Sequence, residues 1–222
     1  DIYYMQAGQG NPEPSPHDRR LINQKVRHVG DRVAAIVAKD IETAKKAAKL
    51  IEVKYEPLEP VFTVEEAMAD NASLVHNGKV EYDVGAPEGL DEYNKGSDAR
   101  DGKVHYCFPL HGDPKHNIAA GAHGGIGDIE KGFAEADAIV DETYQTSQVQ
   151  CTPLEPHVCY AHIENSRLVL NCSTQVPYHV RRIVSTVCNI PENKVHVIKE
   201  RVGGGYGSKQ DILVEDLVGY AC

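Results

Sequence analysis

The stretch Arg167-Leu-Val-Leu-Asn-Cys-Ser-Thr-Gln-Val-Pro177 opens the most regular part of this sequence. Residues 167–173 have the length and apolar content of a buried strand. Pro177 suits the first turn of a helix, whose apolar residues then fall on one stripe, at Val180, Ile183, Val184 and Val187. Lys194-Val-His-Val-Ile198 is the next predicted strand. Strands and helices therefore alternate in this half of the chain.

A second unit of this kind is predicted nearer the start of the chain. Val33-Ala-Ala-Ile-Val-Ala38 is an apolar run of strand length, and Asp40 is a typical N-cap for a helix that follows. Ala44, Ala47, Ala48 and Ile51 lie on one face of that helix. Residues 51–55 alternate as a half-buried strand does. The pattern predicts strand, helix, strand.

Between these units the periodicity weakens. Residues 63–69 predict one or two helical turns, whereas Asn77 to His123 is rich in Gly, Pro, Asp, Asn and His. So long a stretch without elements is unusual inside a compact domain, so we expect a connector lying over other surfaces, with a domain boundary there. Residues 127–137 predict a short helix, and the alternation over 138–146 predicts a long strand after it.

Composition excludes several classes of protein. The 222 residues carry 33 acidic and 23 Lys or Arg side chains, a net charge of −10 that would repel nucleic acid and anionic membranes. No apolar run approaches the roughly 18 residues of a membrane-spanning helix, and no signal segment opens the chain. Six cysteines occur without a Cys-x-x-Cys pair. We expect a cytoplasmic protein with reduced thiols.

Both ends look cut. The chain begins at Asp1 without a Met, and it stops within a predicted helix, 212–222, that carries Leu213, Leu217 and Ala221 on one side. We therefore expect a fragment of a longer protein. An apolar helix face without its partner would also favour self-association of the fragment.

The sharpest local motif is Gly203-Gly-Gly-Tyr-Gly-Ser-Lys-Gln-Asp211, between a predicted strand and a predicted helix. Residues 203–207, hereafter the glycine loop, let the backbone approach a ligand closely, and the helix N-terminus after them would add positive potential. The motif matches neither common nucleotide-binding signature, which weakens the hypothesis of an independent nucleotide-binding protein. A flexible strand-to-helix connection is the structural alternative.

Three further groups of residues are candidates for chemistry. Gln175 lies at the end of a predicted strand, where α/β folds gather ligand groups, although Ser173, Thr174 and Gln175 could equally cap the next helix. Glu155 and His157 suggest acid–base chemistry, but such residues in turns often satisfy backbone groups. The remaining group, with no recognised metal-ligand spacing, is His105, Cys107, His111, His116 and His123. No metal site is assigned.

Six blocks, in this order and spacing, carry a resemblance to a known family: Val29-Gly-Asp-Arg-Val-Ala-Ala-Ile-Val-Ala38, Ala47-Ala-Lys-Leu-Ile-Glu-Val-Lys-Tyr-Glu-Pro-Leu58, Gly127-Asp-Ile-Glu-Lys-Gly-Phe-Ala-Glu-Ala-Asp137, Leu154-Glu-Pro-His157, Ser173-Thr-Gln175 and Gly203-Gly-Gly-Tyr-Gly-Ser-Lys-Gln210. The chain resembles the molybdenum-binding subunit of the xanthine dehydrogenase and aldehyde oxidase family of molybdenum hydroxylases. Bacterial purine-oxidising members are the most similar.

The resemblance implies an α+β fragment with three parts. Residues 1–75 would form a partial α/β-hammerhead domain, 76–126 an extended connector, and 127–222 the truncated first part of a molybdopterin-binding domain. The implied contacts with the molybdopterin-type molybdenum cofactor come from Gln175, Gly204, Gly205, Tyr206 and Gly207, and the implied substrate contact from Gln210. The family usually has Phe where Tyr206 stands. Animal xanthine oxidisers have Glu where Gln210 stands, which leaves the substrate open.

The chemistry that the resemblance implies is hydroxylation of a purine or related N-heterocycle, with water as the oxygen source. The family's general-base Glu lies near the end of the full subunit, so no catalytic residue is assigned, and the chain alone is expected to be inactive. Iron–sulfur clusters and FAD would sit on partner modules that work with the rest of the molybdenum subunit. The alternatives are an aldehyde-oxidising member of the family and a non-catalytic interaction or scaffold protein.

Overall fold

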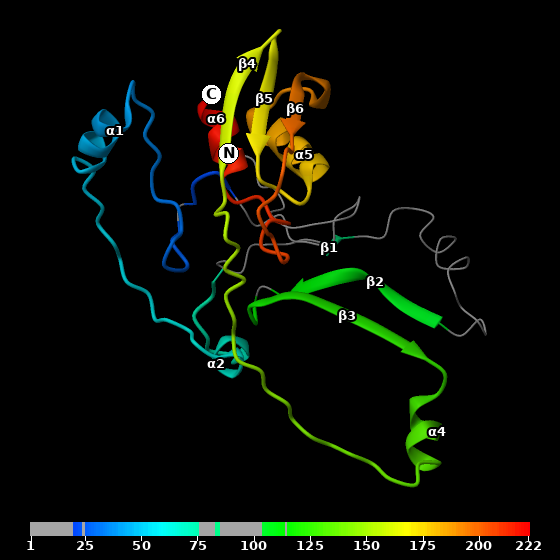
Figure 1. The fold of residues 1–222 in the computed structure, drawn as a ribbon. Coiled ribbons are helices and arrows are strands. Elements are labelled where there is room, and N and C mark those ends of the chain that lie inside the picture. Colours follow the sequence, from blue (N-terminus) through cyan, green and yellow to red (C-terminus); the bar gives the residue numbers. More distant parts are fainter. Residues whose placement is uncertain (1–19, 24, 76–82, 85–103, 114) are drawn as a thin grey trace.

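A computed structural model of the chain describes residues 20–23, 25–75, 83–84, 104–113 and 115–222 (Figure 1). The elements before the last sheet are α1 (Ile41–Ala48), α2 (Val64–Met68), β1 (Asp83–Val84), β2 (Val104–Asp113), β3 (Ile118–Ile126) and α4 (Ile129–Ala134). The remaining elements are β4 (Cys159–Glu164), β5 (Arg167–Cys172), α5 (Pro177–Cys188), the 3-10 turn η1 (Glu192–Lys194), β6 (Val195–Ile198) and α6 (Glu215–Ala221). The described parts of the chain thus mix helices and strands, as predicted.

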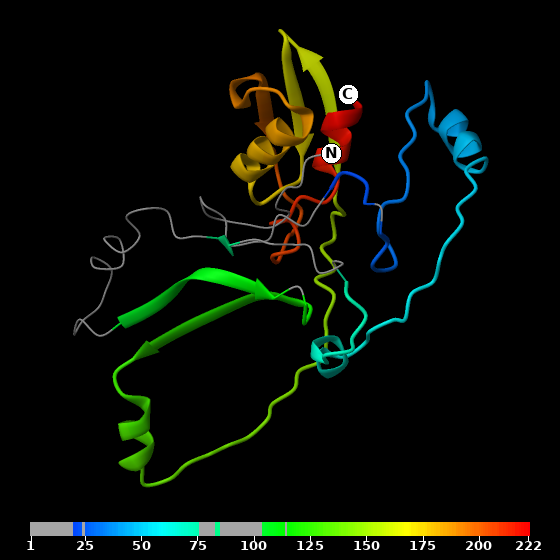
Figure 2. The same ribbon diagram turned by 180° about the vertical axis from the view of Figure 1, so that it is seen from behind.

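The buried core lies in the unit built from β4, β5, β6, α5 and α6. Strand β5 is central, antiparallel to β4 and parallel to β6, and α5 links the two parallel strands. Both helices lie on one face of this sheet (Figure 2). The core cluster comprises Leu168, Leu170, Cys172, Val180, Ile183, Val184, Val195 and Ile212. Helix α6 approaches closely because Gly219 has no side chain: a Cβ there would lie 2.9 Å from Val184 Cγ1.

Local sequence signals explain where these elements begin and end. Asn165 and Ser166 both have positive φ, 49° and 59°, which suits a two-residue hairpin turn between β4 and β5. Pro177 starts α5, and Asn189, at φ 52°, ends it in the left-handed conformation. Asp40 caps α1 as predicted, accepting a hydrogen bond from Thr43 N at 2.7 Å. The predicted helices over 40–51, 63–69 and 127–137 are all present.

The expected connector contains a second sheet. Strands β2 and β3 pair antiparallel within residues 76–126, and β1 pairs with β2. The sequence predicts no elements there, because glycine and histidine obscure the alternation that marks a strand. The turn between β2 and β3 is fastened to the residues around α2, since Asn117 Nδ2 donates to Ala67 O at 2.8 Å and to Ser73 O at 3.1 Å. The predicted domain boundaries at 75/76 and 126/127 stay predictions.

Three predicted strands were wrong. Residues 33–38, 51–55 and 138–146 are extended but form no strand in the structure. Alternation predicts which side chains share a face but not which neighbour supplies hydrogen bonds, and no described segment pairs with these residues. Many of their apolar side chains are exposed, among them Val37 and Tyr144. Figure 1 shows the second of these segments on the long path between α1 and α2 and the third on the path from α4 to β4.

The early part of the chain is attached to α6 by an ion pair. Both guanidinium nitrogens of Arg32 donate to the carboxylate of Asp216, each at 2.8 Å, and Nη2 also donates to Leu213 O. The Asp216 side chain is completely buried and that of Arg32 is 17% exposed. A paired guanidinium and carboxylate in this geometry are the usual form of a buried charge in proteins. This contact joins residues that are 184 positions apart.

Two general features of the described chain complete the fold. Five cysteines are free thiols: Cys151, Cys159, Cys172, Cys188 and Cys222. Within the described ranges, no helix has the length and apolar content needed to cross a membrane.

Candidate functional site

The candidate site lies where β5 ends and where the chain returns from β6 toward α6. Residues 173–175 continue from β5 and run beside residues 203–209, as Figure 1 shows at the lower end of the upper sheet. Gln175 N donates to Lys209 O at 2.8 Å, and Thr174 Oγ1 donates to the same oxygen at 3.4 Å. Two motifs found separately in the sequence are therefore one structural unit.

The side chain of Gln175 fills the inside of the glycine loop. Its Oε1 accepts hydrogen bonds from Gly207 N at 3.2 Å and from Lys209 N at 3.3 Å. A Cβ on Gly205 would lie only 2.5 Å from that oxygen, so a larger residue there would force the Gln175 side chain or the loop to move. No described residue accepts a hydrogen bond from the amide nitrogen of Gln175, whose two N–H groups are of the kind that can donate to a ligand.

The loop backbone supplies further donors. Gly204, Tyr206 and Gly207 have positive φ values of 98°, 50° and 90°. None of the described residues accepts a hydrogen bond from the N–H groups of Gly204, Gly205 or Tyr206. Successive backbone N–H groups in such conformations bind anions and oxygen atoms. The loop and Gln175 together can thus hold a ligand that is rich in oxygen acceptors.

Gln175 does not cap the next helix. The N-cap residue of α5 is Val176, which makes no side-chain capping bond, and Thr174 Oγ1 accepts from Val176 N at 3.1 Å. Of the two interpretations of residues 173–175, capping therefore does not apply to Gln175, although Thr174 does support the helix entry.

Glu155 fastens the loop from the other side. Its Oε2 accepts from Lys209 Nζ and from Gly203 N, both at 2.7 Å, and from the Ser173 hydroxyl. Lys209 Nζ also donates to Ser173 Oγ at 2.9 Å, and the Lys209 side chain is completely buried. The hydrogen bond from Lys209, followed by those from Ser173 and Gly203, lowers the pKa of Glu155 from 4.5 to about 2. Glu155 is therefore a carboxylate with a structural role here and not a proton donor.

Replacing Glu155 by Gln should make the free energy of unfolding depend less on pH under acidic conditions. A carboxyl group whose pKa drops on folding stabilises the protein above its unfolded pKa of 4.5, and this contribution disappears as pH falls through about 2. The free energy of unfolding of the unaltered protein should thus fall more steeply between these values than that of Glu155→Gln. Denaturant titrations at several pH values measure the slopes. Lys209→Met, which removes the main cause of the shift, should also flatten the profile, and parallel profiles for all three proteins would contradict the assignment.

His157 also acts on the backbone. Its Nε2 lies 2.8 Å from Ser208 O, next to the glycine loop. Together with the contacts of Glu155, this geometry matches the expectation that residues 154–157 satisfy backbone groups, and it gives no sign of an acid–base pair. 

The helix N-terminus expected after the loop is not part of the site. Helix α6 begins at Glu215, and the Glu215 carboxylate accepts from Leu213 N at 3.0 Å and Val214 N at 3.1 Å. The chain's own carboxylate thus occupies that helix start. The predicted helix over 212–222 was also too long at its start. The helix buries Glu215, Asp216 and Gly219, while Leu213 and Leu217 are partly buried and Ala221 is exposed.

The other predicted candidates lie outside this arrangement or remain open. Gln210 donates its backbone N–H to Gly207 O at 3.2 Å, and no described residue forms a hydrogen bond with its side-chain amide.

His116 lies beside two carboxylates, Asp113 at 2.6 Å and Asp70 at 3.4 Å, and these raise its pKa, Asp113 more than Asp70. The side chains of His105, Cys107, His111 and His123 lie outside the described part of the structure. Among the residues described, no group of three His, Cys, Asp or Glu side chains could bind a metal.

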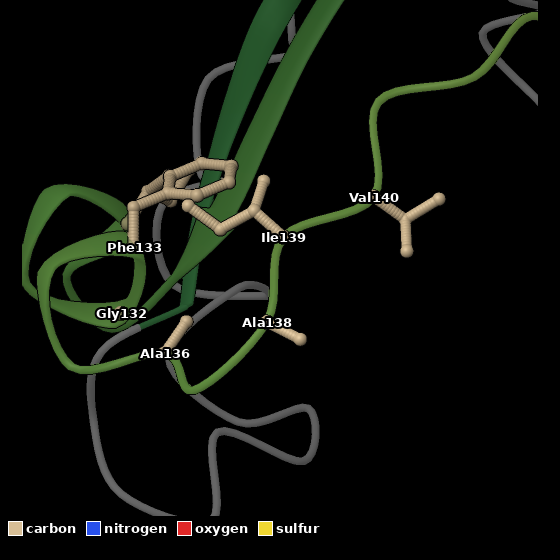
Figure 3. Close-up of a pocket in the computed structure, with 7 residues that line it drawn as sticks. Gly132, Phe133, Ala136, Ala138, Ile139 and Val140 are labelled. Atoms are coloured by element: carbon tan, nitrogen blue, oxygen red, sulfur yellow. The ribbon is translucent and has the colours of Figure 1, made fainter.

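A separate hollow lies between α4 and the segment that follows it. Ile129, Gly132, Phe133, Ala136, Ala138, Ile139 and Val140 line it. Figure 3 shows the Phe133 ring beside the Ile139 side chain. All lining residues are apolar, so the hollow offers no group for acid–base or nucleophilic chemistry, in contrast to the glycine loop.

Comparison with known proteins adds the family context. The family model described as "Molybdopterin cofactor-binding domain" matches residues 110–222. The model described as "Aldehyde oxidase and xanthine dehydrogenase, a/b hammerhead domain" matches residues 3–59. The glycine loop and Gln175 lie within the first of these matches.

Relatives of curated identity match along nearly the whole chain. The protein named "Probable hypoxanthine oxidase XdhD" of Escherichia coli O157:H7 is 52% identical over 221 residues, which is 100% of this chain and 23% of the relative. The "Xanthine dehydrogenase molybdenum-binding subunit" of the same organism is 33% identical over 91% of this chain and 22% of its own length. The chain thus spans about a quarter of the length of these relatives.

Two solved structures of oxidoreductases are similar in fold to this chain. The Cu,Mo-CO dehydrogenase in its carbon monoxide reduced state has a TM-score of 0.53 at 27% identity, covering 83% of this chain and 20% of that one. Quinoline 2-oxidoreductase from Pseudomonas putida 86 has a TM-score of 0.53 at 25% identity, covering 86% and 20%.

Proposed function

The chain belongs to the molybdopterin cofactor-binding domain family, and on this premise we propose that it is part of the molybdenum-binding subunit of a xanthine dehydrogenase-like oxidoreductase. The reaction we propose is hydroxylation of a purine or a related N-heterocycle, with water as the source of the oxygen atom. The cofactor would supply the redox chemistry, and this chain would supply its binding and orientation.

One observation carries the proposal: several hydrogen-bond donors around Gln175 have no acceptor in the described part of the chain. The N–H groups of Gly204, Gly205 and Tyr206 and the amide nitrogen of Gln175 find no acceptor among the described residues. A molybdopterin cofactor presents oxo groups on the metal and phosphate and carbonyl oxygens on the pterin, all of which accept hydrogen bonds. The donor set therefore fits this cofactor, with Gln175, Gly204, Gly205, Tyr206 and Gly207 as its contacts.

The purine substrate is supported by the relatives. The relative that is 52% identical is named a probable hypoxanthine oxidase. The family resemblance places Gln210 at a position that contacts the substrate. Its side-chain amide can both donate hydrogen bonds to a purine ring and accept them from it. An aldehyde substrate remains the alternative within the family.

The complete enzyme would need more than this chain. Because the chain spans 23% of that relative, we propose that the general base and further cofactor contacts lie in other parts of the molybdenum subunit. Iron–sulfur and flavin modules would accept the electrons. Within this chain, no residue is assigned as a general base.

Isotope labelling with the complete protein and its partner subunits tests the proposal. In ¹⁸O-labelled water, hypoxanthine should yield a product with one ¹⁸O atom, and Gln175→Ala should lose most of this turnover. Gln145→Ala is the matched control, since Gln145 is exposed and takes part in none of the hydrogen bonds described for the site. Oxidation of benzaldehyde without oxidation of hypoxanthine would favour the aldehyde alternative. Failure to bind molybdenum at all would overturn the proposal.

A further inference from the structure

A buried lysine, Lys209, lies two residues after the glycine loop. Lys209 Nζ contacts Glu155 Oε2 at 2.7 Å and Ser173 Oγ at 2.9 Å, and its side chain has no exposed surface. A lysine just after a glycine-rich loop often reaches a ligand phosphate, as in nucleotide-binding loops. Here the ammonium group is instead bonded to two side chains of the protein itself.

The backbone of Lys209 also forms hydrogen bonds, two of them with Gln175. Its N–H donates to Gln175 Oε1 at 3.3 Å, and its carbonyl oxygen accepts from Gln175 N at 2.8 Å. Lys209 therefore fixes the end of the loop region to residues 173–175, which continue from β5.

Glu155 holds the beginning of the loop in the same way. Glu155 Oε2 accepts from Gly203 N at 2.7 Å, and Glu155 N donates to Gly203 O at 3.1 Å. A Cβ on Gly203 would lie 2.6 Å from Glu155 Cβ, which shows how closely the two residues approach. One carboxylate thus accepts hydrogen bonds from the first residue of the loop and from the lysine two residues after its end.

We propose that Glu155 and Lys209 act as a clamp that presets the glycine loop for the cofactor, as positioning residues that do not touch it. The pair closes the loop at both ends, so that the N–H groups of Gly204, Gly205 and Tyr206 keep one arrangement before the cofactor arrives. Donors that are held in place beforehand lose little freedom on binding, which strengthens binding. The inference rests on the proposed function, because it assigns a role toward the same cofactor.

The charges of the pair make the clamp testable by a double substitution. Glu155→Gln leaves the completely buried Lys209 ammonium without its charged partner, which is costly, whereas Lys209→Met leaves a carboxylate that is 33% exposed. Neutralising both members removes the penalty on the buried lysine. Lys209→Met keeps an unbranched side chain that is one heavy atom shorter than lysine, and Glu155→Gln preserves an oxygen for Gly203 N. The double variant should therefore be less impaired than the two single variants combined.

The experiment measures how fast molybdenum is lost from the complete, cofactor-loaded protein well below its unfolding temperature. Each single variant should lose molybdenum about tenfold faster than the unaltered protein, and the double variant should recover most of this difference. Lys131→Met, Glu135→Gln and their double variant are matched controls, because that pair is 3.7 Å apart and about two-thirds exposed. The controls should leave the rate unchanged.

Two results would overturn the clamp. If Lys209 bound an anionic group of the cofactor, the double variant would lose molybdenum at least as fast as Lys209→Met. If the pair mattered only for global stability, loss rates would follow the unfolding temperature across all variants. If the unaltered protein contained no molybdenum, the proposed function would be wrong, and the clamp would be wrong with it. Should the double variant not fold, hydrogen exchange of the Gly204–Tyr206 amides in the single variants is the second readout, with faster exchange expected and unchanged exchange contradicting the clamp.

Discussion

Gly205→Ala should abolish most of the molybdenum content of the complete protein. The new Cβ would lie 2.5 Å from Oε1, 2.7 Å from Cδ and 3.1 Å from Cγ of Gln175. Contacts this short force either the glutamine or the loop to move, at a cost of roughly 1 to 3 kcal/mol in well-packed sites. Either movement breaks the arrangement of donors around the cofactor. We expect occupancy to fall to about a tenth or less, measured as molybdenum per chain by mass spectrometry.

The matched control for this substitution is Gly132→Ala. Gly132 lies in α4, and a Cβ there would meet nothing within 4 Å. Alanine also has a higher helix propensity than glycine, so the control should keep full occupancy and stability. A Gly205→Ala protein with full molybdenum content would contradict the close approach of Gln175 to the loop.

Arg32→Ala should produce the largest loss of stability. It leaves the Asp216 carboxylate, which has no exposed surface, without the two guanidinium bonds of 2.8 Å. Breaking a buried ion pair from one side typically costs about 3 to 5 kcal/mol. The free energy of unfolding from denaturant titration should fall by about this amount.

Arg181→Ala provides the comparison for Arg32→Ala. Arg181 lies 3.2 Å from Glu192, and both side chains are more than 40% exposed, so its removal should cost about 1 kcal/mol or less. Equal effects of the two substitutions would show that the contact of Arg32 with Asp216 does not hold the early segment to α6.

The elements that the sequence predicted well are those with local signals. Pro177 and the apolar stripe after it located α5, and Asp40 located α1 through its capping side chain. Residues 167–173 were correctly predicted as a buried strand, since an apolar run of that length needs no information about its neighbours. The family comparisons confirm the predicted fold class, a hammerhead domain followed by a molybdopterin-binding domain.

The failures concern pairing. Strands were predicted at 33–38, 51–55 and 138–146 from alternation alone, but a strand also needs a partner edge. The opposite error occurred for β2 and β3, where Gly, Pro and His residues hid two long paired strands. Alternation indicates which side chains share a face of a strand, but it does not identify the segment that supplies the hydrogen bonds.

The candidate site was predicted in part. The glycine loop and Gln175 were singled out from the sequence, and the structure brings them together through hydrogen bonds of 3.2 and 3.3 Å. The sequence did not predict the contact between Glu155 and Lys209, because the residues are 54 positions apart. The sequence also does not distinguish a buried lysine from an exposed one. Their opposite charges were the only available signal, and the chain has many other acidic and basic residues.

The most direct test of the account is a crystal structure of the complete protein with anomalous data at the molybdenum edge. The account predicts a molybdenum peak beside the amide nitrogen of Gln175, with cofactor oxygen atoms accepting from the N–H groups of Gly204, Gly205 and Tyr206. A molybdenum peak elsewhere in the protein, with this loop and Gln175 free of the cofactor, would contradict it.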